Sequence, residues 1–413
     1  MKRCVLLAVV LTLTGCEGTE LSVHESSAES SNPVTEIASP AAPGSGEPFL
    51  ASGSDGSVLM SWLEPAGEAW ALRFARYAGA EWSEAVTIEE RTDFFVNWAD
   101  FPSIVETPKG NLVAHWLQKS GDAPYAYDVK LAFSSDGGET WSESATLHDD
   151  EVITEHGFVS LVPEGGGEDT VAAIWLDGRK MTGEGHGDGS GAMTLRFARI
   201  HPDGSITDRS ELDDRVCECC QTSMVQSDGR LVAIYRDRSE NEIRDIGIVR
   251  EQPDGWSEPE IVHADGWEIA ACPVNGPQID AAGENVVIAW YTAASEEDRV
   301  HAAFSTDGGT TFGERIRIDA GEALGRVDTV LLDDGRAIVV WLASAGGEGR
   351  ILARSVDREG RLSSVKTLGR SASSRASGFP RMTVADRHVL VAWTEPGERA
   401  RVRVVKIDPE EIS

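Results

Sequence analysis

The sequence predicts an all-β protein folded as a seven-bladed β-propeller of four-stranded blades, and three observations support this prediction. Seven similar apolar segments recur within residues 46–413, at intervals of 51 to 60 residues obtained by subtraction. Each segment is flanked by further short apolar runs, and Gly-rich turns separate the runs. Repeats of this length are typical of proteins built from stacked structural units. Short β-branched runs without helical periodicity favour propeller blades over helical repeats.

The seven repeats align on one aromatic position, in segments such as "GSVLMSWLE" and "RHVLVAWTE". Each aligned segment follows a tight turn such as "SDGR" or "DDGR", and two further strands come after it. The aligned residues are Trp62, Trp116, Trp175, Tyr235, Trp290, Trp341 and Trp393. A six-bladed ring is the alternative, in which one irregular repeat does not form a blade.

The N-terminal residues carry a targeting signal. A basic pair, Lys2 and Arg3, precedes the run "VLLAVVLTL", which is too short to span a bilayer permanently. Residues 1–15 are therefore predicted to be a signal peptide. The following "LTGC" resembles the bacterial lipobox, which implies a lipidated Cys16. We expect a lipid-anchored protein of the cell envelope, and Glu17 in place of Asp favours the outer membrane.

Residues 16–45 are rich in Ser, Glu, Pro and Ala, a composition that predicts a flexible tether. One stretch within it, residues 33–39, is expected to be a strand. The seventh repeat supplies only three strands before the sequence ends, so an N-terminal strand would complete the last blade and protect its edge.

The charge of the chain limits its partners. The sequence holds 37 basic and 69 acidic residues, for a formal net charge of −32. This excess argues against binding nucleic acid or an anionic membrane surface. We expect a monomer that contacts the membrane only through its lipid and binds carbohydrate or a small anionic ligand.

Two turns between third and fourth strands share a motif. The stretches "SSDGGETW" and "STDGGTTF" place Ser, Asp, Gly and an aromatic residue at the same spacing. The Asp side chain accepts backbone N–H groups of its own turn, the Gly allows a positive φ, and the aromatic ring folds back onto the sheet. The pattern resembles the Asp box of the sialidase superfamily, where it is structural. The matching residues are Ser134, Asp136, Gly138, Trp141, Ser305, Asp307, Gly309 and Phe312.

Function is expected on the opposite face of the ring. Loops that precede the innermost strands and loops that follow the second strands surround the central funnel there. Four arginines, Arg236, Arg244, Arg326 and Arg381, together with Asn275, lie in such loops and are predicted to bind a ligand. The alternative is that these arginines pair with neighbouring carboxylates at blade junctions.

The sialidase resemblance implies a specific chemistry. Retaining sialidases clamp the substrate carboxylate with three arginines, and they use a Glu-activated Tyr as nucleophile and an Asp as acid and base. Asp100, Asp237 and Tyr291 are the candidates for catalytic roles. The stretch "FPSI" at 101–104 lacks the first arginine of the sialidase pattern. The sequence therefore predicts a binding propeller without a recognisable catalytic set, and an exo-acting sialidase-like glycoside hydrolase is the alternative.

Four cysteines of the propeller region suggest a third function. Cys217, Cys219 and Cys220 lie in "RVCECCQTS", and Cys272 precedes Trp290 by the same 18 residues that separate Cys217 from Tyr235. Cys272 can thus approach the cluster from the adjacent blade. A disulfide staple is one hypothesis for an oxidising compartment, and a bridge between the neighbours Cys219 and Cys220 is a variant of it. A copper or zinc site formed by Cys217, Cys219 and Cys272, with His156 as fourth ligand, is the other.

Overall fold

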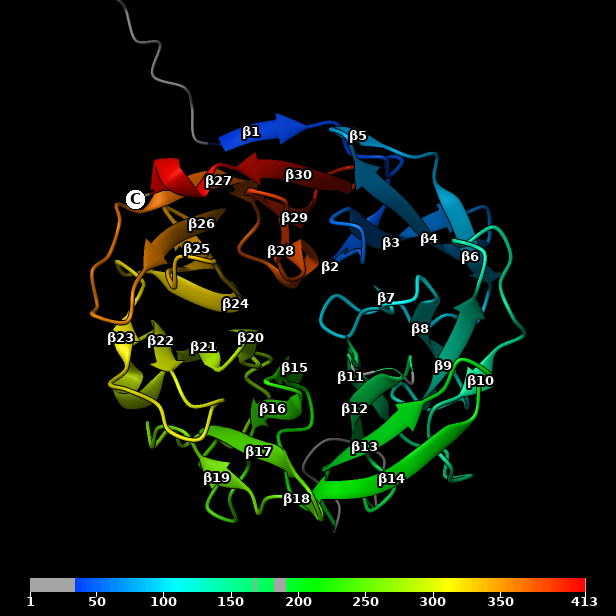
Figure 1. Ribbon diagram of the computed structural model, residues 1–413, viewed down its shortest axis with the longest axis horizontal. Helices are drawn as coiled ribbons and strands as arrows, with labels where there is room; N and C mark the ends of the chain where they lie inside the picture. Colours follow the sequence, from blue (N-terminus) through cyan, green and yellow to red (C-terminus); the bar gives the residue numbers. More distant parts are fainter. Residues whose placement is uncertain (1–33, 166, 168, 182–190, 413) are drawn as a thin grey trace, which may run out of the picture. The chain divides into compact units, whose positions relative to one another are not determined.

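Seven antiparallel sheets form a ring in the computed structural model, as the sequence predicts (Figure 1). The structure describes residues 34–165, 167, 169–181 and 191–412. The predicted signal peptide, Cys16 and most of the tether lie outside these residues. Among the described residues, no helix is long and apolar enough to cross a membrane. Three 3-10 turns, η1 (Ala294–Glu296), η2 (Arg375–Ser377) and η3 (Pro409–Ile412), are the helical segments of this part.

The first four blades follow the chain from its N-terminal part. They are β2 (Gly46–Ser52), β3 (Val58–Ala66), β4 (Ala69–Ala78), β5 (Glu81–Trp82) and β6 (Val86–Arg91); β7 (Ser103–Glu106), β8 (Leu112–Lys119), β9 (Tyr127–Ser134) and β10 (Ala145–Thr146); β11 (His156–Pro163), β12 (Val171–Asp177), β13 (Thr194–Ile200) and β14 (Ile206–Asp213); and β15 (Ser223–Ser227), β16 (Arg230–Arg236), β17 (Ile246–Gln252), β18 (Gly255–Trp256) and β19 (Glu260–Ile261).

The remaining three blades complete the ring. They are β20 (Gln278–Ala282), β21 (Asn285–Thr292), β22 (Arg299–Ser305) and β23 (Ile316–Arg317); β24 (Ala323–Leu331), β25 (Ala337–Ala345), β26 (Glu348–Val356) and β27 (Lys366–Ser371); and β28 (Arg381–Ala385), β29 (His388–Glu395), β30 (Arg401–Ile407) and β1 (Val34–Ile37). The innermost strands are β2, β7, β11, β15, β20, β24 and β28 (Figure 1).

The aligned aromatic residues explain why the repeats fold into blades. All seven lie on second strands, and each is at most 1% exposed. A large ring at the same position of every blade fills the space between that blade and its neighbour, and its burial removes a large apolar surface from water. The aromatic repeat in the sequence is therefore the packing repeat of the ring.

The ring closes as predicted. Strand β1 pairs with β30 in antiparallel register, with Val34 opposite Ile407 and Ile37 opposite Val404. It is the outermost strand of the last blade, which otherwise contains only the three C-terminal strands. The pairing covers the exposed edge of β30 and joins the two ends of the propeller chain.

The Asp boxes are turns, as their chemistry predicts. In the β9–β10 turn, Asp136 accepts the N–H of Thr140 at 3.0 Å, and the Ser134 hydroxyl accepts the N–H of Gly138 at 2.9 Å. Gly138 has a φ of 94°, and a Cβ there would overlap the ring of Phe74 in the preceding blade. The second box, between β22 and β23, repeats these bonds. The boxes therefore stabilise turns and the packing of one blade on the next.

Candidate functional site

A cavity of about 340 Å³ lies between the innermost strands of the ring. Every blade contributes to its wall through its innermost strand or the loop just before it. Its charged, amide and aromatic lining residues are Phe49, Asp100, Phe101, Phe158, Gln221, Gln278, Asp280, Asp328 and Arg381. A small cavity that combines aromatic rings, amides and charged groups can bind a compact polar ligand.

Of the four arginines predicted to bind a ligand, Arg381 is the one that lines this cavity. Its guanidinium lies 5.1 Å from the ring centre of Phe49 and 6.0 Å from that of Phe101. Its Nε is 3.4 Å from a carboxylate oxygen of Asp328, which also accepts the backbone N–H of Met382. Two aromatic faces and one carboxylate thus hold a cation in the cavity wall.

Asp100, one of the three predicted catalytic residues, also lines the cavity and belongs to a buried network. The Tyr127 hydroxyl lies 2.9 Å from Asp100 Oδ2 and 2.8 Å from Glu155 Oε1. The second carboxylate oxygen of Asp100 accepts the N–H of Phe158 at 2.8 Å. A hydroxyl carries a single proton, so it donates to one carboxyl, and the other contact is favourable when that carboxyl is itself protonated.

Burial favours this protonated state. Removal from water raises the pKa of Asp100 to about 7, against the lowering effects of its bonds to Phe158 and Tyr127. Burial, together with the nearby Asp100, raises the pKa of Glu155 to about 8, against the lowering effect of its bond to Tyr127. Desolvation also raises the pKa of the Tyr127 hydroxyl. Near neutral pH the network therefore gains and loses protons beside the cavity.

A further carboxyl of the cavity is affected in the same way. Burial raises the pKa of Asp280 to about 6, although its oxygens accept the N–H groups of Leu331 and Ala281. Burial likewise raises the pKa of Asp328, whereas Arg381 lowers it. The cavity thus contains carboxyls that are easier to protonate than carboxyls in water.

Arg236, Arg244 and Arg326 do not converge on the cavity, in contrast to the predicted anion funnel. Arg236 is 1% exposed and donates to the backbone carbonyls of Asn275, Arg244 and Tyr291 at 2.6–2.7 Å. It therefore holds loops of adjacent blades together. Burial lowers its pKa to about 10, which leaves it charged at neutral pH.

The other two arginines have partners of their own. Arg244 donates to Glu218 at 2.8 Å and to Glu242 at 3.0 Å. Arg326 donates to carbonyl oxygens of Ser374 and Gly378 and lies 4.6 Å from the ring centre of Trp98. The carboxylate pairing expected as the alternative thus describes Arg244, whereas Arg326 is bound by carbonyl groups and an aromatic ring.

Asp237, Tyr291 and Asn275 also lie outside the wall of the cavity. The Tyr291 hydroxyl donates to Asp298, and burial raises its pKa. Burial raises the pKa of Asp237 to about 6. Asn275 accepts the N–H of Arg326 at 2.7 Å through its side chain, which gives it a role in joining loops. Of the residues predicted from sequence, the structure therefore brings only Asp100 and Arg381 to the cavity.

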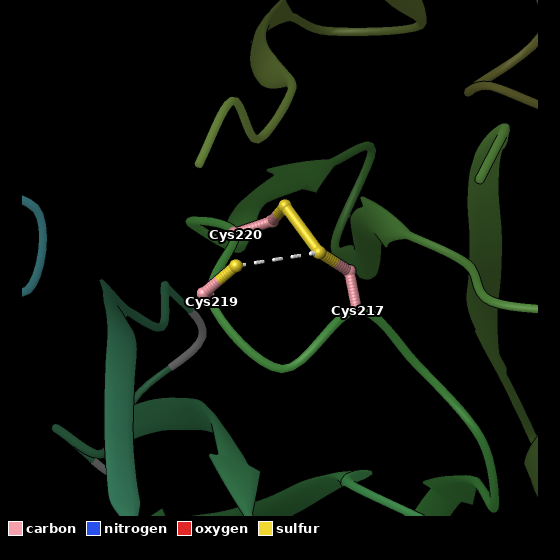
Figure 2. A group of neighbouring side chains, drawn as sticks. All are labelled: Cys217, Cys219 and Cys220. Atoms are coloured by element: carbon pink, nitrogen blue, oxygen red, sulfur yellow. Dashed lines mark hydrogen bonds between the residues drawn. A yellow bond between two sulfur atoms is a disulfide. The ribbon is translucent and has the colours of Figure 1, made fainter. Parts of the chain in front are cut away.

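The four cysteines form two disulfides in the loops before β15 and β20. Cys217 is bonded to Cys220 (Figure 2). Cys219 is bonded to Cys272 of the next blade. The sulfurs of Cys217 and Cys219 lie 3.9 Å apart. With all four sulfurs in disulfides, none is a thiolate that could bind copper or zinc in this state. The staple hypothesis is the one that matches this geometry.

His156 lies in a different cluster from the cysteines. Its ring stacks on His148 at 3.7 Å, beside carboxylates of Asp128, Asp150 and Asp177. The ligand set predicted from Cys217, Cys219, Cys272 and His156 is therefore not assembled. His156 and the cysteines belong to different blades, so their separation in the sequence could not show whether they meet in space.

Comparison with known proteins supports the fold. Residues 69–250 match the BNR repeat-like domain family. An ulvan lyase, described as a new polysaccharide lyase family, is 10% identical, with a TM-score of 0.56 over 89% of this chain and 95% of its own. The chain is a seven-bladed β-propeller that resembles the BNR repeat-like domain over part of its length.

Other enzymes have related folds. An α-L-arabinofuranosidase of Fusarium graminearum is 14% identical, with a TM-score of 0.51 over 76% of this propeller and 94% of its own chain. The NanB sialidase of Streptococcus pneumoniae is 10% identical, with a TM-score of 0.46 over 86% and 84% of the two chains. No curated protein sequence matches the chain. At these identities the likeness concerns the fold of the propeller.

Sequence reasoning missed Tyr127 and Glu155 as partners of Asp100. Tyr127 is the first residue of β9, and Glu155 immediately precedes β11 in the next blade. Both lie at strand ends on the same side of the ring as the loop that carries Asp100. An alignment of strand starts between blades would have placed the two residues near one another. Only the packing of the two blades, however, shows that Tyr127 is the residue that contacts Asp100.

Proposed function

We propose that this propeller binds a small carbohydrate, most favourably an acidic one, in its central cavity. One observation carries the proposal: Arg381 is held in the cavity wall between the rings of Phe49 and Phe101. Aromatic faces pack against sugar rings, and a guanidinium binds a carboxylate through two parallel hydrogen bonds. The fold-level likeness to an ulvan lyase and an arabinofuranosidase is consistent with a carbohydrate ligand.

Calorimetric titration with a panel of neutral sugars, uronic acids and sialic acid tests the proposal. We expect at least one acidic sugar to bind, and Arg381→Gln to weaken it roughly 10- to 150-fold, the effect of losing one charge-assisted hydrogen bond. Arg361→Gln is the matched control, because this arginine is largely exposed and pairs with Asp357 and Glu359.

A second pair of variants separates binding from folding. Arg381→Gln leaves Asp328 buried beside a neutral side chain, so the double variant Asp328→Asn with Arg381→Gln removes both charges. Retained cooperative unfolding with lost binding of acidic sugars supports the proposal. Equal weakening by the Arg361 control, or no binding of any sugar by the wild-type protein, contradicts it.

A hydrolase or lyase acting at the same cavity is the second candidate, and the Asp100–Tyr127–Glu155 network favours it. An acid whose pKa is about 7 can both donate and accept a proton at neutral pH. Assays with a fluorogenic sialoside and acidic polysaccharides test for turnover. If the reaction is real, Asp100→Asn should abolish turnover while sugar binding remains. If the wild-type protein binds sugars without turnover, the binding proposal stands and the enzymatic one is contradicted.

We also propose that the propeller acts at the cell envelope, anchored by lipid on Cys16. The sequence "LTGC" after a short apolar run supports this location. Labelling with a radioactive fatty acid should mark the wild-type chain and not a Cys16→Ser variant. Unlabelled wild-type protein released into the medium would contradict the anchor.

A further inference from the structure

A cluster of two histidines and several aspartates lies between the second and third blades, outside the wall of the central cavity. His148 and Asp150 follow β10, Asp128 is in β9 and His156 begins β11. The side chains of His148 and His156 are 3% and 0% exposed. Both ring nitrogens of His148 and Nε2 of His156 are buried without a hydrogen-bond partner.

Leaving so many polar atoms unsatisfied is costly, at about 1–3 kcal/mol for each buried group. The atoms nevertheless lie close together. His148 Nε2 is 3.5 Å from Asp128 Oδ1, His148 Nδ1 is 3.3 Å from Asp150 Oδ2, and His156 Nε2 is 3.3 Å from Asp150 Oδ1. A metal ion with ligands at about 2.1 Å in tetrahedral geometry separates neighbouring ligand atoms by about 3.4 Å. The contacts of His148 to Asp128 and to Asp150 use different ring nitrogens, so the ligand atoms that one ion can share are those of Asp128, His148 and His156. Because the two stacked rings are parallel, one of them must turn for both to bind the same ion.

We propose that Asp128, His148 and His156 bind one divalent transition-metal ion, with Zn²⁺ as the best match. Two imidazoles and one carboxylate are a set of three protein ligands that zinc accepts, with a fourth position left for water. Their ligand atoms lie within 4.8 Å of one another. Asp150 contacts both histidine rings and lies beside them without being counted as a ligand.

Residues around the cluster orient these ligands. His156 Nδ1 lies 3.3 Å from the backbone carbonyl of Tyr127, so this nitrogen carries the proton and Nε2 has its lone pair free. Lys130 binds Asp128 through Oδ2 at 3.1 Å, which leaves Oδ1 facing His148.

Charged groups of both signs surround the cluster. Asp128, Asp149, Asp150 and Asp177 contact Lys130 and Arg179. Arg179 forms two hydrogen bonds to Asp177, one to each carboxylate oxygen, so this carboxylate is held beside the ion and is not counted as a ligand. Two more arginines approach from outside: Arg196 at 3.8 Å from Asp177, also paired with Glu211, and Arg209 at 3.9 Å from Asp149.

Metal binding to the full chain, stripped with a chelator and kept under non-reducing conditions, tests the proposal. Titration with ZnCl₂ should show one site, and the double variant His148→Asn with His156→Asn should lower the affinity at least tenfold. Saturating Zn²⁺ should raise the unfolding temperature of the wild-type protein and leave that of the double variant unchanged. His201→Asn, an exposed histidine bonded to Thr207, is the matched control and should behave as wild type.

Cobalt replacement decides the outcome even if the double variant fails to fold. One equivalent of Co²⁺ in the wild-type protein should give visible bands of a tetrahedral site without the near-ultraviolet band of a cobalt–thiolate bond. A thiolate band would assign the metal to the cysteines and overturn the proposal. Absence of stoichiometric binding, or equal loss of affinity in the His201 variant, would overturn it as well.

Discussion

Replacing Asp100 by Asn should make the stability of the propeller less dependent on pH. Asn keeps the size of the side chain, its oxygen can accept the N–H of Phe158, and its amide can donate to the Tyr127 hydroxyl. The substitution therefore removes an ionisable group and preserves the hydrogen bonds. The change isolates the energetic cost of charging a buried carboxyl.

The sign of the effect follows from the direction of the pKa shift. Burial raises the pKa of Asp100 from 3.8 to about 7, so the folded protein holds a proton that the unfolded chain has already released. Stability from this group is fully present below pH 3.8 and is lost as the pH rises through about 7. Each pH unit within this window costs about 1.4 kcal/mol for one group. From pH 5 to 7 the wild-type protein should lose about 2.5 kcal/mol more than the variant.

Glu155 enlarges the effect. Its pKa of about 8 depends in part on the charge of Asp100, which the variant lacks. The pKa of Glu155 should therefore fall in the variant, and part of its own pH dependence should disappear with that of Asp100. Glu155→Gln should reduce the slope in the same way and extend the difference to about pH 8.

Urea unfolding at pH 5, 6, 7 and 8, followed by tryptophan fluorescence, measures the difference. The free energies of wild type and Asp100→Asn should diverge as the pH rises toward 7, with the variant the more stable protein at pH 7. Asp254→Asn, at an exposed turn, provides the control and should run parallel to the wild type. Parallel curves for the Asp100 variant would show that the carboxyl is already ionised at pH 5, and the buried protonated network would then be wrong.

Three further substitutions test the framework around the cavity. Cys219→Ser opens the disulfide to Cys272, which spans 53 residues, and should lower the free energy of unfolding by roughly 4 kcal/mol, measured in urea with and without reductant. Gly138→Ala should lower the free energy of unfolding by about 2–4 kcal/mol, because φ is positive there and the new Cβ would overlap the ring of Phe74. Its control, Gly137→Ala, also has a positive φ but meets open space, and should cost about 1 kcal/mol; thermal unfolding measures both. Arg236→Met leaves three carbonyls without their donor and should cost about 3–5 kcal/mol in urea unfolding; a loss below 1 kcal/mol would refute its joining role.

The fold could be predicted because its information is repeated and local. Each blade has the same aromatic residue on its second strand, so seven short patterns support one another. Strand β1 was predictable for a different reason: the last repeat was one strand short, and a propeller edge needs a partner. The Asp boxes were predictable because their hydrogen bonds connect residues within five positions.

The site could be predicted only in part, because its partners are distant in the chain. Topology placed Asp100 and Arg381 beside the axis, since both precede or begin innermost strands. The same reasoning failed for Arg236 and Arg326. Their donors are taken by backbone carbonyls, which every residue possesses and no sequence pattern marks.

The seam between the second and third blades shows why buried polar clusters are hard to see in sequence. Tyr127 contacts Asp100 and Glu155 through its hydroxyl and His156 through its carbonyl, so one strand start joins the cavity to the histidine cluster. The strands of adjacent blades end there, and an isolated bridge between Tyr127 and Glu155 pairs the two backbones. Side chains must then satisfy one another, and the sequence records only that several polar residues occur near strand ends. An ion bound by the histidines would fix the segment before β11. Glu155 lies in that segment and is linked through the Tyr127 hydroxyl to Asp100 in the cavity wall.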